Sequence, residues 1–162
     1  MSNDASQPLS AVQAQLLAGQ LLKPLTPLYN MALACRIDGA LDQHCMLKAW
    51  GKIAHNSEAL GIRIEASDHS VSQSAGHLPP ALELLDLSAS EHADDDARRY
   101  MQNDVSTVIK NDGVLGRARL IKLASDRWIF YCNLHHVICD ATSFSLLWRK
   151  LAHAYTLSLI HI

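Results

Sequence analysis

The apolar run from Trp128 to Leu134 constrains the fold of this chain more than any other feature. Its tryptophan, isoleucine, phenylalanine and tyrosine favour extended structure, and none of its residues is charged. A strand of this composition is expected to be buried on both faces. Only Ala124-Ser125-Asp126-Arg127 separates it from the segment 117–123, so the two segments predict a β-hairpin.

The rest of the chain alternates helical and extended patterns. Helices are expected over 11–22, 41–56, 88–111 and 144–155, with Ser10 capping the first and Ser88 or Ser90 capping the third. Strands are expected over 29–37 and 59–65, and 67–80 is interpreted as a weak strand followed by a loop. This order predicts an α/β fold, with a mixed sheet flanked by helices.

Composition restricts the classes of function. The 162 residues, of which 49% are hydrophobic and 19% charged, suit one globular domain or part of a larger one. A net charge of −2 without a basic stripe argues against nucleic-acid binding. The polar segment 1–7 resembles no signal peptide and is expected to be flexible, and no apolar run is long enough to span a membrane. Four scattered cysteines indicate reduced thiols and a cytoplasmic location.

The chemically richest segment, His135 to Ser143, directly follows the apolar run. Histidine titrates nearest neutral pH, so a His pair with Asp140 nearby is a plausible site of proton transfer. Side chains alternate along a strand, so only one of the two imidazoles can enter a given cavity. Asp140 could orient an imidazole or anchor the loop through a cation, while Thr142 or Ser143 could cap the next helix.

Two other interpretations of the His pair remain open from the residues alone. Both imidazoles could be core side chains with satisfied hydrogen bonds. A metal site is disfavoured, because His135 and His136 diverge on a strand and no second His or Cys cluster has ligand spacing. We therefore expect no bound metal.

Six landmarks, in this order, resemble the condensation domain of nonribosomal peptide synthetases. They are Leu9-Ser10-Ala11-Val12-Gln13, Tyr29-Asn30-Met31, Gly39-Ala40-Leu41-Asp42 with Ala49-Trp50, Glu58-Ala59-Leu60, Val114-Leu115-Gly116-Arg117, and His135-His136-x-x-x-Asp140-x-x-Ser143. A single His-x-x-x-Asp would be a weak signal, whereas six ordered landmarks are specific.

The resemblance implies one half of a larger domain. The family has two lobes of chloramphenicol-acetyltransferase-like fold that form a V, with the active site in a tunnel between them. Residues 8–156 resemble the N-terminal lobe, so the C-terminal lobe with its latch and floor loop is expected to be missing. Residues 157–162 resemble translated sequencing-adapter sequence and are expected to be a non-native tail.

The resemblance also implies a reaction and its residues. The family joins two acyl groups carried on the phosphopantetheine arms of carrier domains, next to an adenylation domain and with no directly bound cofactor. His136 is expected at the reacting centre, as a base or as an orienting group. His135 is expected to be structural, Asp140 to hold the loop and Ser143 to fix the helix start. The isolated lobe is expected to be inactive.

The chain departs from the family pattern at two places. Ala141 stands where the family usually has glycine, which removes the freedom for positive φ. The arginines usual around Glu58-Ala59-Leu60 are absent, and in the family one of them pairs with the motif aspartate. Asp140 is therefore expected to find another cation, Arg63 or Arg117, or to lie more exposed.

Three alternative functions stay open. One is another His-x-x-x-Asp acyltransferase, CoA-dependent or wax-ester synthase-like, which the Leu9-Ser10-x-x-Gln13 and Tyr29-Asn30 landmarks disfavour. The second is an epimerization domain, which usually has tryptophan shortly after the motif serine, where Phe144 stands here. The third is a degenerate, non-catalytic interaction lobe. The His pair excludes a cyclization domain, in which aspartate replaces it.

Overall fold

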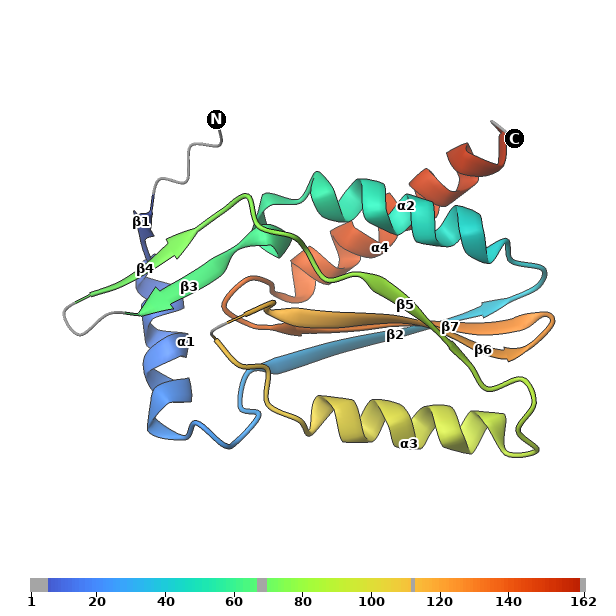
Figure 1. Ribbon diagram of the computed structural model, residues 1–162, viewed down its shortest axis with the longest axis horizontal. Helices are drawn as coiled ribbons and strands as arrows, with labels where there is room; N and C mark the ends of the chain where they lie inside the picture. Colours follow the sequence, from blue (N-terminus) through green and yellow to red (C-terminus); the bar gives the residue numbers. More distant parts are fainter. Residues whose placement is uncertain (1–5, 67–69, 112, 161–162) are drawn as a thin grey trace.

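The main sheet carries the predicted hairpin at its centre. The computed structural model describes residues 6–66, 70–111 and 113–160. Within them, β2 (Asn30–Asp38), β7 (Arg127–His135), β6 (Gly116–Ala124) and β5 (Leu82–Asp86) lie side by side in the order β2-β7-β6-β5. The β6–β7 hairpin is antiparallel and β5 joins β6 in parallel, so the predicted mixed sheet is confirmed (Figure 1).

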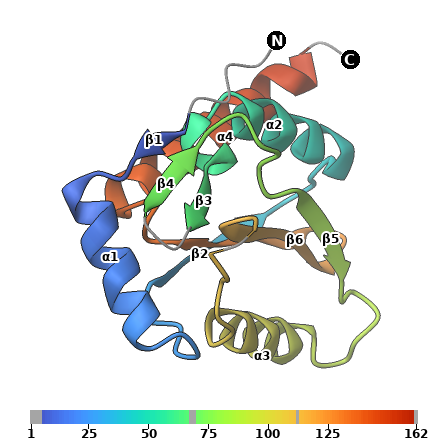
Figure 2. The ribbon, with the colours of Figure 1, turned by 60° about the vertical axis from the view of Figure 1, so that its left-hand side comes forward.

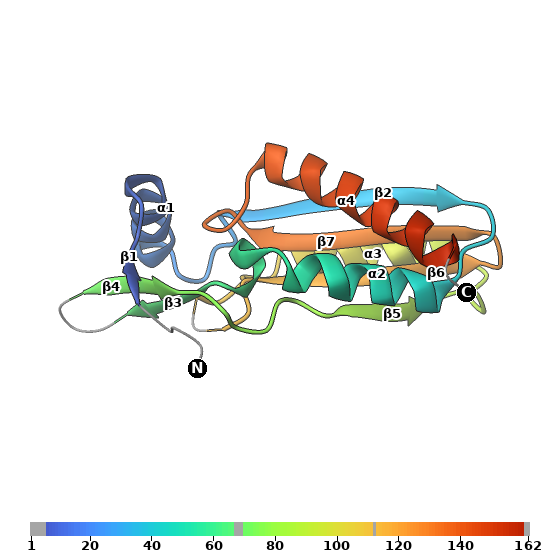
Figure 3. The ribbon, with the colours of Figure 1, turned by 90° about the horizontal axis from the view of Figure 1, so that it is seen from above.

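Helices cover both faces of this sheet. The helices α2 (Gln43–His55) and α4 (Ala141–Ile160) lie on one face, and α3 (Ala93–Val105) lies on the other (Figure 1). Seen from above, α4 crosses over β2 and β7 (Figure 3). The central strand β7 is thus covered on both sides, which accounts for its uncharged, aromatic sequence.

A second unit stands at one end of the main sheet. It consists of α1 (Ala11–Leu22) and a three-stranded antiparallel sheet in the order β1 (Gln7–Pro8), β4 (Val71–Ser74) and β3 (Arg63–Ala66) (Figure 2). Residues 1–5 of the segment expected to be flexible lie outside the described residues, and Gln7 of that segment pairs with Gln73 in the small sheet. Part of the segment 67–80 does form the expected strand, β4.

Aromatic side chains anchor the core on the α2–α4 side. Phe130 of β7 is fully buried, and its ring centroid lies 5.4 Å from that of Trp50 and 5.6 Å from that of Trp148. The Trp50 indole N–H donates to the carbonyl of Pro80 over 2.7 Å, so its polar atom is satisfied. The neighbouring residue Tyr131 points to the other face, where it packs with Ala97 of α3.

Three local expectations differ from the structure. The segment 59–65 begins as a 3-10 turn, η1 (Glu58–Gly61), and becomes extended only at Arg63. The strand β5 was not expected, since its short Leu-Glu-Leu-Leu-Asp sequence becomes extended through pairing with β6. The third helix is shorter than 88–111 and has no side-chain cap, because it begins at Ala93 with His92 in the N-cap position, after both Ser88 and Ser90.

Candidate active site at the end of strand β7

The His pair lies where β7 leaves the sheet, and the backbone fixes it there. The His135 amide donates to the carbonyl of Leu115 over 2.9 Å, and the His136 amide donates to the carbonyl of Tyr29 over 2.8 Å. These two bonds tie the pair to the segments entering β6 and β2. The chain then turns, with the Ile138 amide donating to the His135 carbonyl over 3.0 Å.

His135 is a buried and neutral ring. Its side chain has no exposed surface, and its ring centroid lies 6.1 Å from that of Tyr29. The Val137 amide donates to Nδ1 over 3.1 Å, so Nδ1 accepts and the ring proton resides on Nε2. Burial, and secondarily the nearby His136, lowers the pKa of His135 to about 4. The ring supports the turn of the loop at Val137.

His136 is partly exposed and differently bonded. Its Nδ1 lies 2.6 Å from the carbonyl oxygen of Cys139. A carbonyl can only accept, so Nδ1 carries the proton and Nε2 of the neutral ring bears the lone pair. This arrangement leaves one imidazole nitrogen free to accept a proton, with the other nitrogen anchored.

Asp140 caps helix α4. One of its carboxylate oxygens accepts from the amide of Ser143 over 2.7 Å and from the Ser143 hydroxyl over 2.6 Å. These Ser143 hydrogen bonds, the hydroxyl first, lower the pKa of Asp140. The expectation that Thr142 or Ser143 supplies the cap is therefore wrong, because the helix begins earlier, at Ala141, and Asp140 itself precedes it.

Neither candidate arginine reaches Asp140. Arg117 forms an ion pair with Asp104, with Nε 2.6 Å from a carboxylate oxygen. Arg63 donates to the carbonyls of Ile62 and Leu78. Of the two arrangements expected for Asp140, an Arg63 or Arg117 partner is ruled out, since other acceptors hold both side chains, and the more exposed arrangement is found. Asp140 is exposed instead, and no cation of the described residues lies within ion-pair distance of it.

Ala141 occupies an ordinary helical position. It is the first residue of α4, and no non-glycine residue in the described part of the chain has positive φ. The backbone here does not require glycine, so its replacement by alanine introduces no conformational strain. The methyl group instead lines a shallow hollow between α4 and β2, together with Met31, Phe144 and Trp148.

Gln13 belongs to the first sequence landmark, but nothing in the sequence indicated that its side chain reaches the motif loop. Ser10 caps α1 as expected, and the two side chains form a reciprocal capping box. The side-chain amide nitrogen of Gln13 also donates over 3.2 Å to the carbonyl of Val137, inside the motif loop. The Leu-Ser-x-x-Gln landmark thus links the first helix to a loop more than a hundred residues away, a contact without any local signal.

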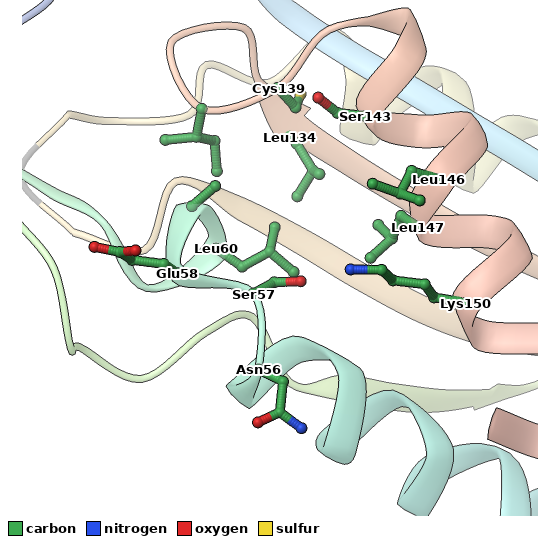
Figure 4. Close-up of a pocket in the computed structure, with 12 residues that line it drawn as sticks. Asn56, Ser57, Glu58, Leu60, Leu134, Cys139, Ser143, Leu146, Leu147 and Lys150 are labelled. Carbon is green, nitrogen blue, oxygen red and sulfur yellow. The ribbon is translucent and has the colours of Figure 1, made fainter.

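A cavity of about 200 Å³ opens beside the motif loop (Figure 4). It lies between the end of α2, η1 and the first turns of α4, and Cys139 and Ser143 of the motif loop form part of its wall. The opposite wall consists of Glu58, Ala59 and Leu60, so this sequence landmark lies at the site. His136 is not among the lining residues, so the cavity adjoins the His pair and does not contain it.

The described ranges contain neither a cluster of metal ligands nor a helix suited to a membrane. Within residues 6–66, 70–111 and 113–160, no group of three or more His, Cys, Asp or Glu side chains is arranged to hold a metal ion. None of the helices in these ranges is both long enough and apolar enough to cross a membrane.

Comparison with known proteins assigns the family. The family model described as "Condensation domain" matches residues 3–159. A linear gramicidin synthase protein of Brevibacillus parabrevis is 30% identical over 161 residues, which are 96% of this chain and 3% of that protein. The dimodular nonribosomal peptide synthase of Bacillus subtilis is 26% identical, over 96% of this chain and 7% of that protein.

Solved structures agree in fold. The starter condensation domain of rhizomide synthetase RzmA superposes with a TM-score of 0.88 at 26% identity, covering 93% of this chain and 37% of that one. The first condensation domain of the calcium-dependent antibiotic synthetase, solved with a substrate analogue, superposes with a TM-score of 0.80 at 25% identity. The match covers 91% of this chain and 36% of that one. The expected chloramphenicol-acetyltransferase-like fold is confirmed. This chain belongs to the condensation domains of nonribosomal peptide synthetases and spans about a third of the solved members it matches.

Proposed function

We propose that this lobe supplies the histidine side of an amide-forming active site. The observation that carries the proposal is the bond from His136 Nδ1 to the Cys139 carbonyl, which leaves Nε2 free. The substrates are a donor acyl thioester and an acceptor aminoacyl thioester, each on the phosphopantetheine arm of a carrier domain. The second lobe of the domain and an adjacent adenylation domain are the other partners.

The proposed reaction is aminolysis of a thioester. The acceptor amine attacks the donor carbonyl, the new C–N bond forms, and a tetrahedral intermediate results. The C–S bond then breaks, the amide forms and the donor carrier keeps a free thiol. The amine loses one proton, which His136 Nε2 accepts and can return to the leaving thiolate. Such general-base help is worth about 10²- to 10⁴-fold, and orientation of the amine can contribute as much.

The neighbouring residues act as positioning groups in this proposal. His135 shapes the turn through Val137, Asp140 and Ser143 fix the start of α4, and Gln13 holds the Val137 carbonyl. Ala141 borders the site on the β2 side. Arg117 pairs with Asp104, which also accepts from Asn133 of β7, and Arg63 holds the carbonyl of Leu78.

The proposal also covers the cellular compartment of the protein and the activity of the isolated chain. Free thiols at Cys35, Cys45, Cys132 and Cys139 fit a reducing cytoplasm. Neither nucleic acid nor a membrane is a proposed partner. Because the chain spans about a third of solved condensation domains, we expect the 162-residue chain alone to have no turnover. Amide formation by this chain alone from loaded carrier proteins would contradict that expectation.

The decisive experiment completes the domain. Residues 8–156 would be fused to the second lobe of the rhizomide starter domain and assayed for amide formation from loaded carriers. We expect His136→Ala to lower the rate about 10²-fold or more. His153→Ala, which alters an exposed histidine of α4, is the matched control and should leave the rate unchanged. An unchanged rate in His136→Ala would overturn the proposal.

A second candidate is a non-catalytic lobe, and the observation that favours it is the exposed Asp140 without an arginine partner. In such a lobe the fusion would fold and bind carriers but form no amide with His136 intact. The same assay therefore separates the two candidates.

A further inference from the structure

The cavity beside the motif loop extends along one face of α4. Ser143, Leu147 and Lys150 line it, and their spacing of four and then three residues places them on the same face of the helix. Seven residues of α-helix rise by roughly 10 Å. The cavity therefore begins at the motif loop and reaches Lys150 about two helical turns away.

The middle of the cavity is apolar. Leucine and isoleucine side chains from η1, β7, the motif loop and α4 form its wall: Leu60, Leu134, Ile138, Leu146 and Leu147. A cavity of about 200 Å³ with such a lining suits a flexible alkyl chain of medium length.

Lys150 places a cation at the far end of this apolar space. Figure 4 shows its amine directed into the cavity, toward the same region as the Ser57 hydroxyl. No ion pair of Lys150 exists among the residues that the structure describes, and neither α2 nor α4 contains an aspartate or glutamate. The other charged lining residue, Glu58, lies on the opposite side of the cavity in Figure 4.

The surroundings of Lys150 increase the positive potential. A neighbouring hollow between α2 and α4 shares Asn56 and Lys150 with the cavity and adds a second lysine, Lys52. Basic groups without acidic neighbours on these two helices attract an anion to this end. Lys150 is itself exposed, so a carboxylate can reach its ammonium at this end of the cavity, whereas a neutral alkyl end would gain no partner there.

We propose that this cavity binds an acyl chain that ends in a carboxylate, with Lys150 as the residue that determines this specificity. The inference rests on the proposed function, since it names the class of acyl group that the site accepts. The chain of the ligand replaces water along Leu60 and Leu147. Its terminal carboxylate pairs with the Lys150 ammonium, with the Ser57 hydroxyl as an additional hydrogen-bond donor.

The test compares two ligands that differ only at the far end. The 162-residue chain would be titrated calorimetrically, at low ionic strength, with the octanoyl thioester of N-acetylcysteamine and with its ω-carboxylated counterpart. We expect the carboxylated thioester to bind about five- to tenfold more tightly. Lys150→Met should remove this preference and leave octanoyl binding in place, and Lys150→Arg should retain part of the preference.

Arg149→Met is the matched control, because it removes the same charge from the adjacent position of α4, outside the cavity lining. It should keep the preference. Equal binding of the two thioesters, loss of the preference in Arg149→Met, or no binding of either thioester would each overturn the inference.

The proposed function is tested separately from this preference. The cavity does not include His136, so His136→Ala should keep the preference while it loses amide formation in the fused domain. A fused domain that forms amides equally from both acyl groups would overturn the Lys150 inference and leave the proposed reaction intact.

Discussion

The imidazole of His136 donates from Nδ1 to the carbonyl oxygen of Cys139, over 2.6 Å. This bond closes the loop that follows β7 and fixes which ring nitrogen bears the lone pair. The chemistry proposed for the site depends on this relationship, because a base must present an unprotonated nitrogen toward its substrate. Without the bond, the two tautomers of the ring would compete.

The tautomer of His136 is directly measurable. Because the Cys139 carbonyl cannot donate, the neutral ring should be the Nδ1–H form. Long-range proton–nitrogen NMR spectra of the chain should show protonated Nδ1 and unprotonated Nε2 when the ring is neutral. His153, which is exposed on α4, serves as the internal reference and should show the ordinary mixture of tautomers. A protonated Nε2 on neutral His136 would contradict the arrangement.

His135 should make stability depend on acid pH. Its pKa is lowered from 6.5 to about 4 by burial, so the unfolded chain binds a proton first as the pH falls. The neutral ring makes its full contribution to the free energy of unfolding above pH 6.5. That free energy falls by about 3 kcal/mol in total as the pH drops from 6.5 to about 4.

Urea unfolding at several pH values checks this prediction. His135→Gln, which keeps an acceptor for the Val137 amide, should flatten the decline between pH 6.5 and 4. His153→Gln should leave it unchanged, since that side chain is exposed. The same slope in His135→Gln would assign the pH dependence to other groups.

Asp140 should stabilise the start of α4 through capping. Asp140→Ala removes the acceptor for the Ser143 amide and should lower the melting temperature by about 2–4 °C. Asp140→Asn should retain most of the stability, because asparagine caps helices as well as aspartate does. Thermal unfolding measures both, with Glu91→Ala as an exposed acidic control. Equal melting temperatures for Asp140→Ala and Asp140→Asn would argue against a capping role.

The ion pair of Arg117 and Asp104 should contribute much more than a surface pair. Asp104 is only 9% exposed and also accepts from the Tyr131 hydroxyl and the Asn133 amide. Asp104→Ala leaves these donors and the Arg117 charge without their acceptor, so we expect a loss of about 3 kcal/mol in the free energy of unfolding.

Chemical denaturation provides the measurement for Asp104→Ala. The control is Asp95→Ala, whose ion pair with Arg98 is exposed on both sides and should contribute below about 1 kcal/mol. Similar losses in the two variants would show that the buried network does not anchor α3 to the sheet.

Gln13 should couple α1 to the motif loop. Gln13→Glu keeps the oxygen that accepts from the Ser10 amide, but it cannot donate to the Val137 carbonyl. Hydrogen exchange should therefore accelerate at the amides of residues 136–140 and stay slow along α1. Uniform acceleration in both segments would mean that Gln13 acts only through the helix cap.

Much of the fold was predictable because its signals are local. The uncharged run Trp128 to Leu134 indicated a central strand, and four turn residues indicated its hairpin. The capping box of Ser10 and Gln13 spans three residues, so it could be inferred directly from sequence. By contrast, β5 has little intrinsic preference for extended structure and depends on its parallel partner β6.

The sequence by itself determined the family, the order of most elements and the position of the His pair at a strand end, since each of these depends on residues close together in the chain. Only the tertiary structure decided that Arg117 pairs with Asp104, that Asp140 caps α4 without an arginine, and that Lys150 enters the cavity. The physical reason is that a side chain's partner depends on which distant segments pack beside it, and no local pattern of residues specifies that choice.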